Sequence, residues 1–186
     1  MIDPSSWTHF YVVCDNHVMV GCGAIEPYWG EKKKRTIGDR KMVEINFYEQ
    51  VEDERLKFAV IISKTDGKWV FCKHKERNTY EVPGGHREMG ETIFETAKRE
   101  LREETGAIDF NMKPVCVYSV KGKTRENETL NDETFGMLFV ADIISFEKEL
   151  HSEIEKILIT DDLVEHWTYP LIQPKLIEET KNRGYL

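Results

Sequence analysis

Hydrophobic residues along the chain form short runs separated by polar turns. These runs predict strands over residues 57–62, 69–73, 113–120 and 135–143. The polar turn at residues 65–68 separates the first two runs, so they are expected to form a hairpin. The third and fourth runs are rich in Val, Phe and Met, which favour strands over helices.

Two other stretches predict helices. The first helix is expected to start near Glu91 and to stop at Gly106, because glycine commonly ends helices. Its apolar residues recur at helical spacing: Ile93, Phe94, Ala97 and Leu101. The second helix is expected from about Pro170, which suits a first turn, to Lys181, with Gly184 beyond its end. Strands on both sides of a central helix, followed by a late helix, indicate the α/β class and a sandwich of layers.

The N-terminal segment has its own pattern. The apolar runs at residues 10–13 and 18–25 flank a polar turn and predict a β-hairpin. We therefore expect a β-rich extension over residues 1–50 and an α/β domain over residues 51–186. The extension is expected to add strands to the main sheet or to form a contact in a homodimer.

Composition narrows the class of protein. A chain of 186 residues suits one core plus an extension, and the formal net charge of −8 argues against a general nucleic-acid-binding protein. Neither a signal peptide nor an apolar run of membrane-spanning length is evident, so no membrane partner is expected. The four cysteines lack C-x-x-C spacing and are expected to be buried thiols in the cytoplasm: Cys14, Cys22, Cys72 and Cys116.

An acidic cluster falls within the first predicted helix. Glu100, Glu103 and Glu104 stand at positions i, i+3 and i+4, so a helix places their carboxylates on one side. Like charges at this spacing repel each other unless a cation lies between them, and Mg²⁺ or Mn²⁺ prefers such oxygen ligands. The alternative is a solvated acidic face that pairs with Lys and Arg. Gly84 and Gly85 follow Pro83 and allow the backbone to approach a ligand closely.

The same stretch resembles the Nudix box, G-x5-E-x7-R-E-U-x-E-E-x-G-U, in which U is aliphatic. Gly85, Glu91 and residues 99–107 fill every constrained position, and residues 80–85 (Y-E-V-P-G-G) resemble the family's W-E-F-P-G-G lead-in. The resemblance covers about residues 55–182 and implies a Nudix-type α/β/α sandwich with a mixed sheet. It also implies that the Gly84 carbonyl coordinates metal together with the carboxylates of the acidic cluster.

The resemblance assigns roles to further residues. Arg99, four residues before Glu103, is expected to orient a carboxylate or a phosphate oxygen. Glu153 resembles the acidic residue that many Nudix enzymes present from a late loop, where it acts as a metal ligand or general base. The alternative for Glu153 is an ordinary surface glutamate. Glu91 is expected to be structural, because it lies far along the helix from the carboxylate cluster.

The implied reaction is metal-assisted hydrolysis of a phosphoanhydride, with Mg²⁺ as the cofactor and Mn²⁺ as a substitute. The chain most resembles the MutT-type nucleoside triphosphate hydrolases, including the 8-oxo-dGTP diphosphatase type. Hydrolysis of a nucleoside triphosphate to the monophosphate and pyrophosphate is therefore expected. ADP-ribose, a dinucleoside polyphosphate or a 5′-triphosphate RNA end remain alternative substrates. A nucleotide-sensing module without turnover and an interaction protein that uses its N-terminal hairpin remain alternative functions.

Other residues are candidates for substrate contacts. Four basic residues precede the box and could face phosphates: Lys73, His74, Lys75 and Arg77. Five aromatic residues could stack on a base, although aromatic residues in strands are usually core: Tyr118, Phe135, Phe139, Trp167 and Tyr169. The polar loop at residues 121–125 is expected to face the nucleoside.

The extension carries a second, weaker resemblance. Residues 20–25 (V-G-C-G-A-I) are similar to a strand of GNAT acetyltransferases, and residues 35–40 partly resemble their pyrophosphate loop. However, Arg40 stands where a small residue would let backbone amides reach the phosphate. The chain also has no room for the rest of that fold, which argues against an acetyltransferase.

Overall fold

The computed structural model describes residues 10–14, 17–21, 43–122, 124, 127, 129, 131–150 and 153–186. It divides the chain into two compact units, Met1–Gly38 and Asp39–Leu186. In the first unit β1 (Phe10–Cys14) pairs antiparallel with β2 (His17–Gly21), which confirms the predicted hairpin. Residues 22–40, which include most of the resemblance to GNAT enzymes, lie outside the described residues.

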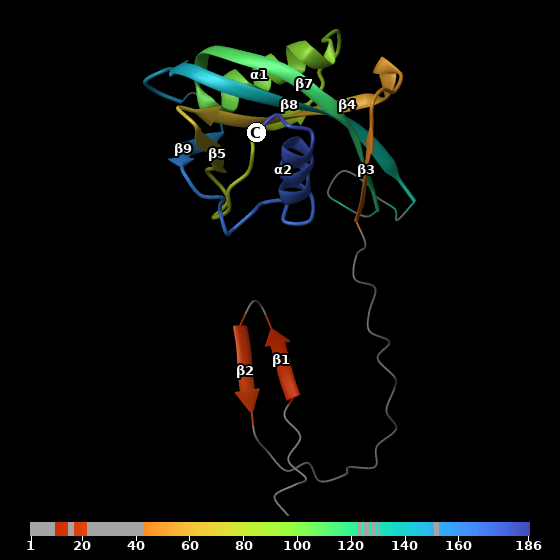
Figure 1. Cartoon of the computed structure of the whole chain (residues 1–186), viewed down its shortest axis with the longest axis vertical. Coiled ribbons are helices and arrows are strands. Elements are labelled where there is room, and N and C mark those ends of the chain that lie inside the picture. The colour runs from red at the N-terminus through yellow and green to blue at the C-terminus, as the bar shows by residue number, and fades with distance from the viewer. Residues whose placement is uncertain are drawn as a thin grey trace, which may run out of the picture. The chain divides into compact units, whose positions relative to one another are not determined.

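The second unit is built on a seven-stranded sheet in the order β3-β7-β8-β4-β5-β9, with β6 paired to β4 (Figure 1). The strands are β3 (Glu44–Tyr48), β4 (Leu56–Thr65), β5 (Lys68–His74), β6 (Gly84–His86), β7 (Ala107–Lys121), β8 (Glu133–Phe146) and β9 (Ile154–Thr160). Only the β4–β8 pair is parallel, so the sheet is mixed. Strand β3 falls in the segment expected to be the extension, yet it pairs with β7.

The hairpin of β4 and β5 closes where the polar turn predicts it. Thr65 pairs with Lys68, and the two residues between them, Asp66 and Gly67, have φ angles of 49° and 79°. Positive φ at both central residues is the geometry of a type I′ turn, whose twist matches that of the strands. Strands β7 and β8 extend beyond the predicted runs, because polar residues such as Asp109 and Asn111 continue the antiparallel pairing at one end.

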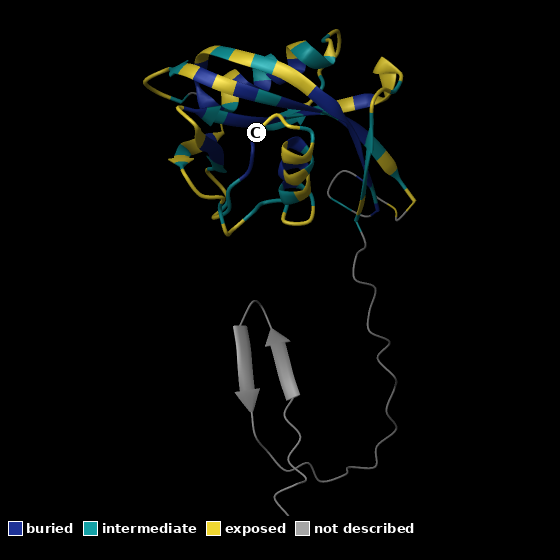
Figure 2. Ribbon diagram, in the orientation of Figure 1, coloured by how far each residue is buried: buried dark blue, intermediate teal, exposed yellow. Residues whose placement is uncertain are grey.

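The sheet lies between two helices, α1 (Ile93–Thr105) and α2 (Gln173–Asn182) (Figure 1). Neighbouring residues of a strand point to opposite faces. In β4, Ile61 belongs to the core that contains Leu101 of α1, and Ile62 belongs to the core that contains Leu176 of α2. Figure 2 shows buried residues along the strands between the helices and exposed residues along one side of α2. The α/β/α sandwich is thereby confirmed.

Helix α1 has the limits that its sequence predicts. Thr92 and Glu95 form a capping box, in which each side chain accepts a hydrogen bond from the other residue's backbone N–H. Gly106 ends the helix in the left-handed region at φ 70°, where a side chain would be strained. The orientation of the carboxylates on α1 therefore rests on a helix that is defined at both ends.

Replacing Thr92 with Ala removes the side-chain half of the capping box. We expect the free energy of unfolding to fall by about 1 kcal/mol, because the Glu95 backbone N–H loses its acceptor. Urea denaturation monitored by circular dichroism would measure the change. Thr92→Ser keeps the hydroxyl and should behave like the wild type; equal losses in both variants would contradict a role for the cap.

The second helix starts later than predicted. Residues 170–172 form a turn and α2 begins at Gln173, so the predicted start at Pro170 is wrong. A helix from Pro170 would place Pro174 in its interior, where proline lacks the N–H needed for the i to i−4 hydrogen bond. Starting at Gln173 puts Pro174 in the first turn, where that N–H has no partner in any case.

Two of the four cysteines lie in the described part of the sheet. Cys72 and Cys116 are buried free thiols, which confirms the prediction for these two. The side chain of Cys14 and all of Cys22 lie outside the described residues. Among the described helices, none is long and apolar enough to cross a membrane.

Candidate active site

Strands β4 and β5 are paired along only part of their length. Strand β4 pairs with β5 only over residues 63–65, while residues 58–60 pair with the short strand β6. Strand β6 carries Gly84 and Gly85 and lies against α1. The carboxylates of α1 therefore meet a glycine backbone at the gap between β4 and β5.

A cleft with a volume of about 380 Å³ lies at this gap, within the usual size of small-molecule sites. Part of its lining is charged or is glycine backbone: His74, Arg77, Glu81, Gly84, Gly85, Glu100, Glu104 and Glu153. Part of it is aromatic or apolar: Phe58, Val60, Tyr118, Val120, Tyr169, Ile172 and Leu176. The cleft therefore offers both an anion- or metal-binding surface and a surface for a ring.

Glu100 occupies the space that a side chain at residue 85 would need. It is 9 % exposed, and its Oε1 accepts a hydrogen bond from Arg99 Nη1 at 2.8 Å. A Cβ atom on Gly85 would lie 2.1 Å from the same Oε1. Burial raises the pKa of the Glu100 carboxyl, and Arg99 opposes this shift.

Glu104 lies one turn further along α1 and contacts Gly84, the other glycine of β6. Its Oε2 accepts a hydrogen bond from the backbone N–H of Gly84 at 2.8 Å. Burial raises the pKa of the Glu104 carboxyl to about 8, and the negative charges of Glu100 and Glu81 add to this effect. Two carboxylates held in one cleft repel each other, so a cation bound between them is favourable. In Mg²⁺ sites that also bind phosphates, the protein usually contributes one or two carboxylates. The donor set therefore fits a divalent cation.

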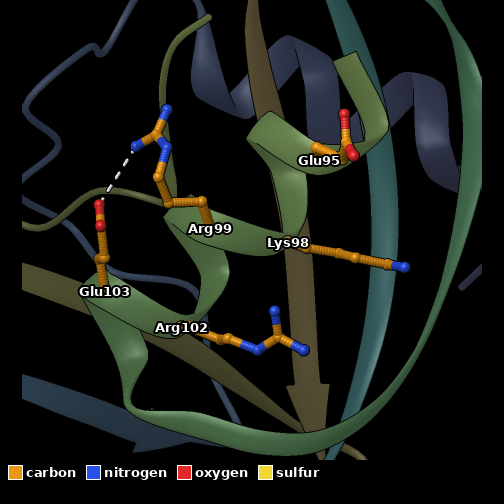
Figure 3. Close-up of a pocket in the computed structure, with 5 residues that line it drawn as sticks. All are labelled: Glu95, Lys98, Arg99, Arg102 and Glu103. Carbon is orange, nitrogen blue, oxygen red and sulfur yellow. Dashed lines mark hydrogen bonds and ion pairs between the residues drawn. The ribbon is translucent and has the colours of Figure 1, made fainter. Parts of the chain in front are cut away.

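Glu103, the third carboxylate of the predicted cluster, is directed elsewhere. Its Oε2 accepts a hydrogen bond from Arg99 Nη1 at 3.1 Å, and its side chain is 53 % exposed (Figure 3). Across the described ranges, no three carboxylate, imidazole or thiol groups stand close enough together to hold a metal ion. The structure thus brings Glu100 and Glu104 together in the cleft and leaves Glu103 outside it.

Arg99 links the carboxylates to the loop before the helix. Besides Glu100 and Glu103, it donates to the His86 carbonyl at 2.9 Å and to Glu91 through Nε at 2.7 Å. Glu91 also accepts hydrogen bonds from Thr96 Oγ1 and the backbone N–H of Glu88. The Arg99 hydrogen bonds are the main cause that lowers the Glu91 pKa to about 2. Glu91 thus bonds to the arginine that also bonds to Glu100 and Glu103, and neither Glu91 nor Arg99 lines the cleft.

A second hollow lies on the outer side of α1. It is lined by five charged side chains of one helix: Glu95, Lys98, Arg99, Arg102 and Glu103 (Figure 3). In Figure 3, Lys98 and Arg102 extend away from the linked pair Arg99 and Glu103. This hollow has neither a glycine backbone nor aromatic residues, so the cleft at β6 is the better candidate for the site.

Glu153 lies at the cleft beside His74. The Nε2 atom of His74 is 2.9 Å from Glu153 Oε2, and Nδ1 of the same ring accepts a hydrogen bond from the Glu76 backbone N–H at 3.1 Å. With Nδ1 as acceptor, Nε2 carries the proton and donates to Glu153. This hydrogen bond is the main cause that lowers the pKa of the Glu153 carboxyl.

The four basic residues before the box separate into two groups. His74 and Arg77 line the cleft, and Arg77 donates to both carboxylate oxygens of Glu81 at 3.0 and 3.1 Å. Lys73 is paired with Glu155, and Lys75 is absent from the cleft lining. Among the described residues that line the cleft, Arg77 is therefore the only arginine or lysine.

The aromatic candidates separate in the same way. Tyr118 and Tyr169 line the cleft, whereas Phe135, Phe139 and Trp167 do not. Phe139 is buried on the α1 face of the sheet, Phe135 is buried in a third small core, and Trp167 packs against the core of the α2 face. The prediction that Phe135 faces a nucleoside is therefore wrong.

Some lining residues were not predicted from the sequence. Gln173 of α2, Phe58 of β4 and Thr134 of β8 are the main examples. Thr134 donates to Asn127 Oδ1 at 2.9 Å, and Asn127 in turn donates to the carbonyl of Val120 at 2.9 Å. No short motif marks these residues, because they come from separate elements that meet only in the folded chain.

Known proteins are similar to this chain in sequence and in fold. The NUDIX domain family matches residues 53–180. YtkD of Bacillus subtilis, a candidate 8-oxo-dGTP diphosphatase, is 37% identical over 83 residues, which are 45% of this chain and 52% of YtkD. The ADP-ribose pyrophosphatase of Methanocaldococcus jannaschii is 30% identical over 89 residues, 46% of this chain and 50% of that protein. The chain thus spans about half the length of these two curated relatives.

A solved structure matches a larger share of the chain than these two relatives do. The crystal structure of the Bacillus subtilis pyrophosphohydrolase BsRppH superposes with a TM-score of 0.62 and 27% identity, covering 77% of this chain and 92% of that one. The family match covers more than half of the chain and includes β4, β6, α1 and both cleft carboxylates. This chain therefore belongs to the Nudix family, whose members are hydrolases that act on pyrophosphate bonds and generally use divalent metal ions.

Proposed function

We propose that this protein is a Mg²⁺-dependent Nudix hydrolase that converts a nucleoside triphosphate to the monophosphate and pyrophosphate. The observation that carries the proposal is the pairing of Glu100 and Glu104 with the glycines of β6 in one cleft. A surface that also contains Tyr118 and Tyr169 suits a nucleoside joined to a phosphate chain. 8-oxo-dGTP is the first substrate to test, because YtkD has the highest identity of the relatives compared.

Three groups of the cleft would hold the metal: the carboxylates of Glu100 and Glu104 and the carbonyl of Gly84. When bound, Mg²⁺ neutralises phosphate charge and makes a water molecule more acidic, so that hydrolysis becomes faster. Glu103 becomes a further ligand if its side chain leaves Arg99, to which a single hydrogen bond now holds it. Arg99 fixes the position of Glu100 in either case.

Glu153 is proposed to accept the proton of the attacking water. His74 occupies its Oε2 atom by a hydrogen bond from Nε2, which leaves Oε1 for the proton. The lowered pKa keeps the Glu153 carboxyl in its charged form, which is the form that accepts a proton, but it also makes Glu153 a weaker base than an ordinary glutamate. Arg77 is proposed to contact a phosphate oxygen, since it lies in the cleft with its guanidinium on Glu81.

ADP-ribose is a second candidate substrate. It is favoured by the 30% identity to the Methanocaldococcus jannaschii ADP-ribose pyrophosphatase. ADP-ribose has a diphosphate joined to a sugar at each end. It therefore needs space for a second sugar beyond the phosphates, whereas a nucleoside triphosphate ends there in phosphate oxygens. A direct assay separates the two substrates.

The experiment is an assay of five compounds side by side: GTP, dGTP, 8-oxo-dGTP, ADP-ribose and triphosphorylated RNA. Each is incubated with the protein in Mg²⁺ and in EDTA, and released pyrophosphate and orthophosphate are measured separately. For ADP-ribose, whose hydrolysis releases neither, AMP and ribose 5-phosphate are measured instead. We expect Mg²⁺-dependent release of pyrophosphate from several purine triphosphates, because one stacked ring contributes only about 1 kcal/mol and does not select a base strongly. A large preference for ADP-ribose would contradict the proposal that the substrate is a nucleoside triphosphate. Hydrolysis that persists in EDTA would contradict the proposal that the reaction needs a metal ion.

The N-terminal segment is proposed to be separate from this chemistry. Every described residue that lines the cleft lies at or after Phe58. We propose that the functional domain begins near residue 50. Strand β3 at residues 44–48 lies before this boundary and pairs with β7 at the edge of the sheet.

A further inference from the structure

Gln173 has a buried side-chain oxygen with no hydrogen-bond partner among the described residues. The residue is 5 % exposed and lines the cleft. Among the residues that the structure describes, Gln173 Oε1 is the only buried side-chain oxygen or nitrogen atom without a hydrogen-bond partner. Other buried polar side chains are satisfied: Ser63 donates to the Val70 carbonyl, and Thr180 donates to the Leu176 carbonyl.

Gln173 lies at the N-terminal end of α2. It is the first residue of α2, and the N-terminal cap of this helix, Ile172, makes no side-chain hydrogen bond. The backbone N–H of Gln173 is already used, because it donates to the Tyr169 carbonyl at 3.0 Å. The amide side chain is therefore held by the backbone at the cleft without serving as a cap.

The neighbours of Gln173 in the cleft suit a flat ring. Tyr118 and Tyr169 supply aromatic side chains, and Ile172 and Leu176 supply apolar ones from the same end of α2. Burial holds the pKa of the Tyr118 hydroxyl far above its ordinary range, so this residue stays neutral. A ring that stacks or packs on these residues would bring its polar edge toward Gln173, whose Oε1 is the buried side-chain acceptor that lacks a partner among the described residues.

We propose that Gln173 Oε1 accepts a hydrogen bond from an N–H group on the edge of a purine base and thereby determines which nucleotides bind. The inference rests on the proposed function in one respect, that the ligand is a nucleotide. Guanine offers N1–H and its 2-amino group, and adenine offers its 6-amino group. A purine that lacks N–H groups leaves the buried oxygen unpaired, which a site built for a hydrogen bond disfavours.

The experiment compares two ligands that differ at the base edge. Both are 5′-triphosphates with a methylene group between the α and β phosphorus atoms, so that the bond is not hydrolysed: one carries guanine and the other unsubstituted purine. Their dissociation constants are measured by titration calorimetry in Mg²⁺. We expect the wild type to bind the guanine compound at least about tenfold more tightly, the effect of one hydrogen bond.

Two variants replace the amide with apolar side chains of similar length, Gln173→Leu and Gln173→Met. Both should lose the preference for guanine and bind the two compounds equally. The control is Thr180→Val, which removes a buried hydroxyl of the same helix away from the cleft and should keep the preference. Thermal unfolding of all variants checks that each is folded, and one folded variant at residue 173 suffices for the comparison.

The outcomes separate this inference from the proposed function. A preference that persists in the Gln173 variants, or is missing from the wild type, overturns the role of Gln173. If the guanine compound binds with the expected pattern but GTP is not hydrolysed, the proposed activity fails while the role of Gln173 is supported. If neither compound binds, both are overturned.

Discussion

Replacing Glu104 with Gln is expected to lower kcat about a thousandfold, which corresponds to about 4 kcal/mol in the activation free energy. The substitution removes the charge that would hold the metal but keeps the volume of the side chain. The amide oxygen of Gln can still accept the hydrogen bond that Gly84 N–H now donates to Glu104. Because phosphoryl transfer depends mainly on charge stabilisation, activity should fall while the fold is kept.

The measurement is steady-state release of pyrophosphate at saturating Mg²⁺, with thermal unfolding as the check on folding. Glu178→Gln is the matched control, because it makes the same change at an exposed position of α2 and should leave kcat unchanged. A rate near that of the wild type in Glu104→Gln would remove Glu104 from the site. Glu103→Gln is measured in the same way. If its kcat falls as much as that of Glu104→Gln, Glu103 leaves Arg99 to bind metal.

The helix and its two cleft carboxylates could be predicted because the information is local. Helical spacing places Glu100 and Glu104 on one side of α1, and Gly106 ends that helix by its conformation alone. The direction of Glu103 could not be predicted in this way. It depends on Arg99, which depends in turn on Glu91, and the three are joined only by side-chain geometry.

The surface for the nucleoside was harder to predict because it is assembled from distant elements. Tyr118 of β7, Tyr169 before α2 and Gln173 of α2 meet in the cleft, although more than fifty residues separate the first from the others. Phe139 shows the opposite case. Strand alternation, applied from the register of β4 and β8, places it on the α1 face, which is away from the α2 face on which Tyr118 packs.

Replacing Gly85 with Ala is expected to lower kcat about a hundredfold or more while changing stability little. The new methyl group would lie 2.1 Å from Glu100 Oε1 and 2.6 Å from Oε2, so the carboxylate has to move. The end of a glutamate side chain can move at modest cost in stability, but a displacement of about 1 Å in a catalytic group typically costs about a hundredfold in rate. Activity and the temperature of unfolding are measured on the same preparation.

Gly84→Ala is the matched comparison, because its methyl group meets the main chain. It would lie 2.5 Å from the Ala59 carbonyl oxygen and 3.0 Å from Val60 Cα, so strand β6 has to shift away from β4. This substitution should therefore lower the free energy of unfolding by roughly 1–3 kcal/mol, as overpacking does. If the two alanine variants lose stability equally, the distinction between a side-chain and a backbone clash is wrong.

A shorter acid at residue 100 tests the cause of the loss directly. In Gly85→Ala, the further change Glu100→Asp withdraws the carboxylate by one methylene group and relieves the contact with the new methyl group. On its own, Glu100→Asp should also lower kcat, because the carboxylate then falls short of its place beside β6. If the clash is the cause, the double variant should be more active than the product of the two single losses predicts. Losses that simply multiply would show that Gly85 acts independently of Glu100, through its backbone.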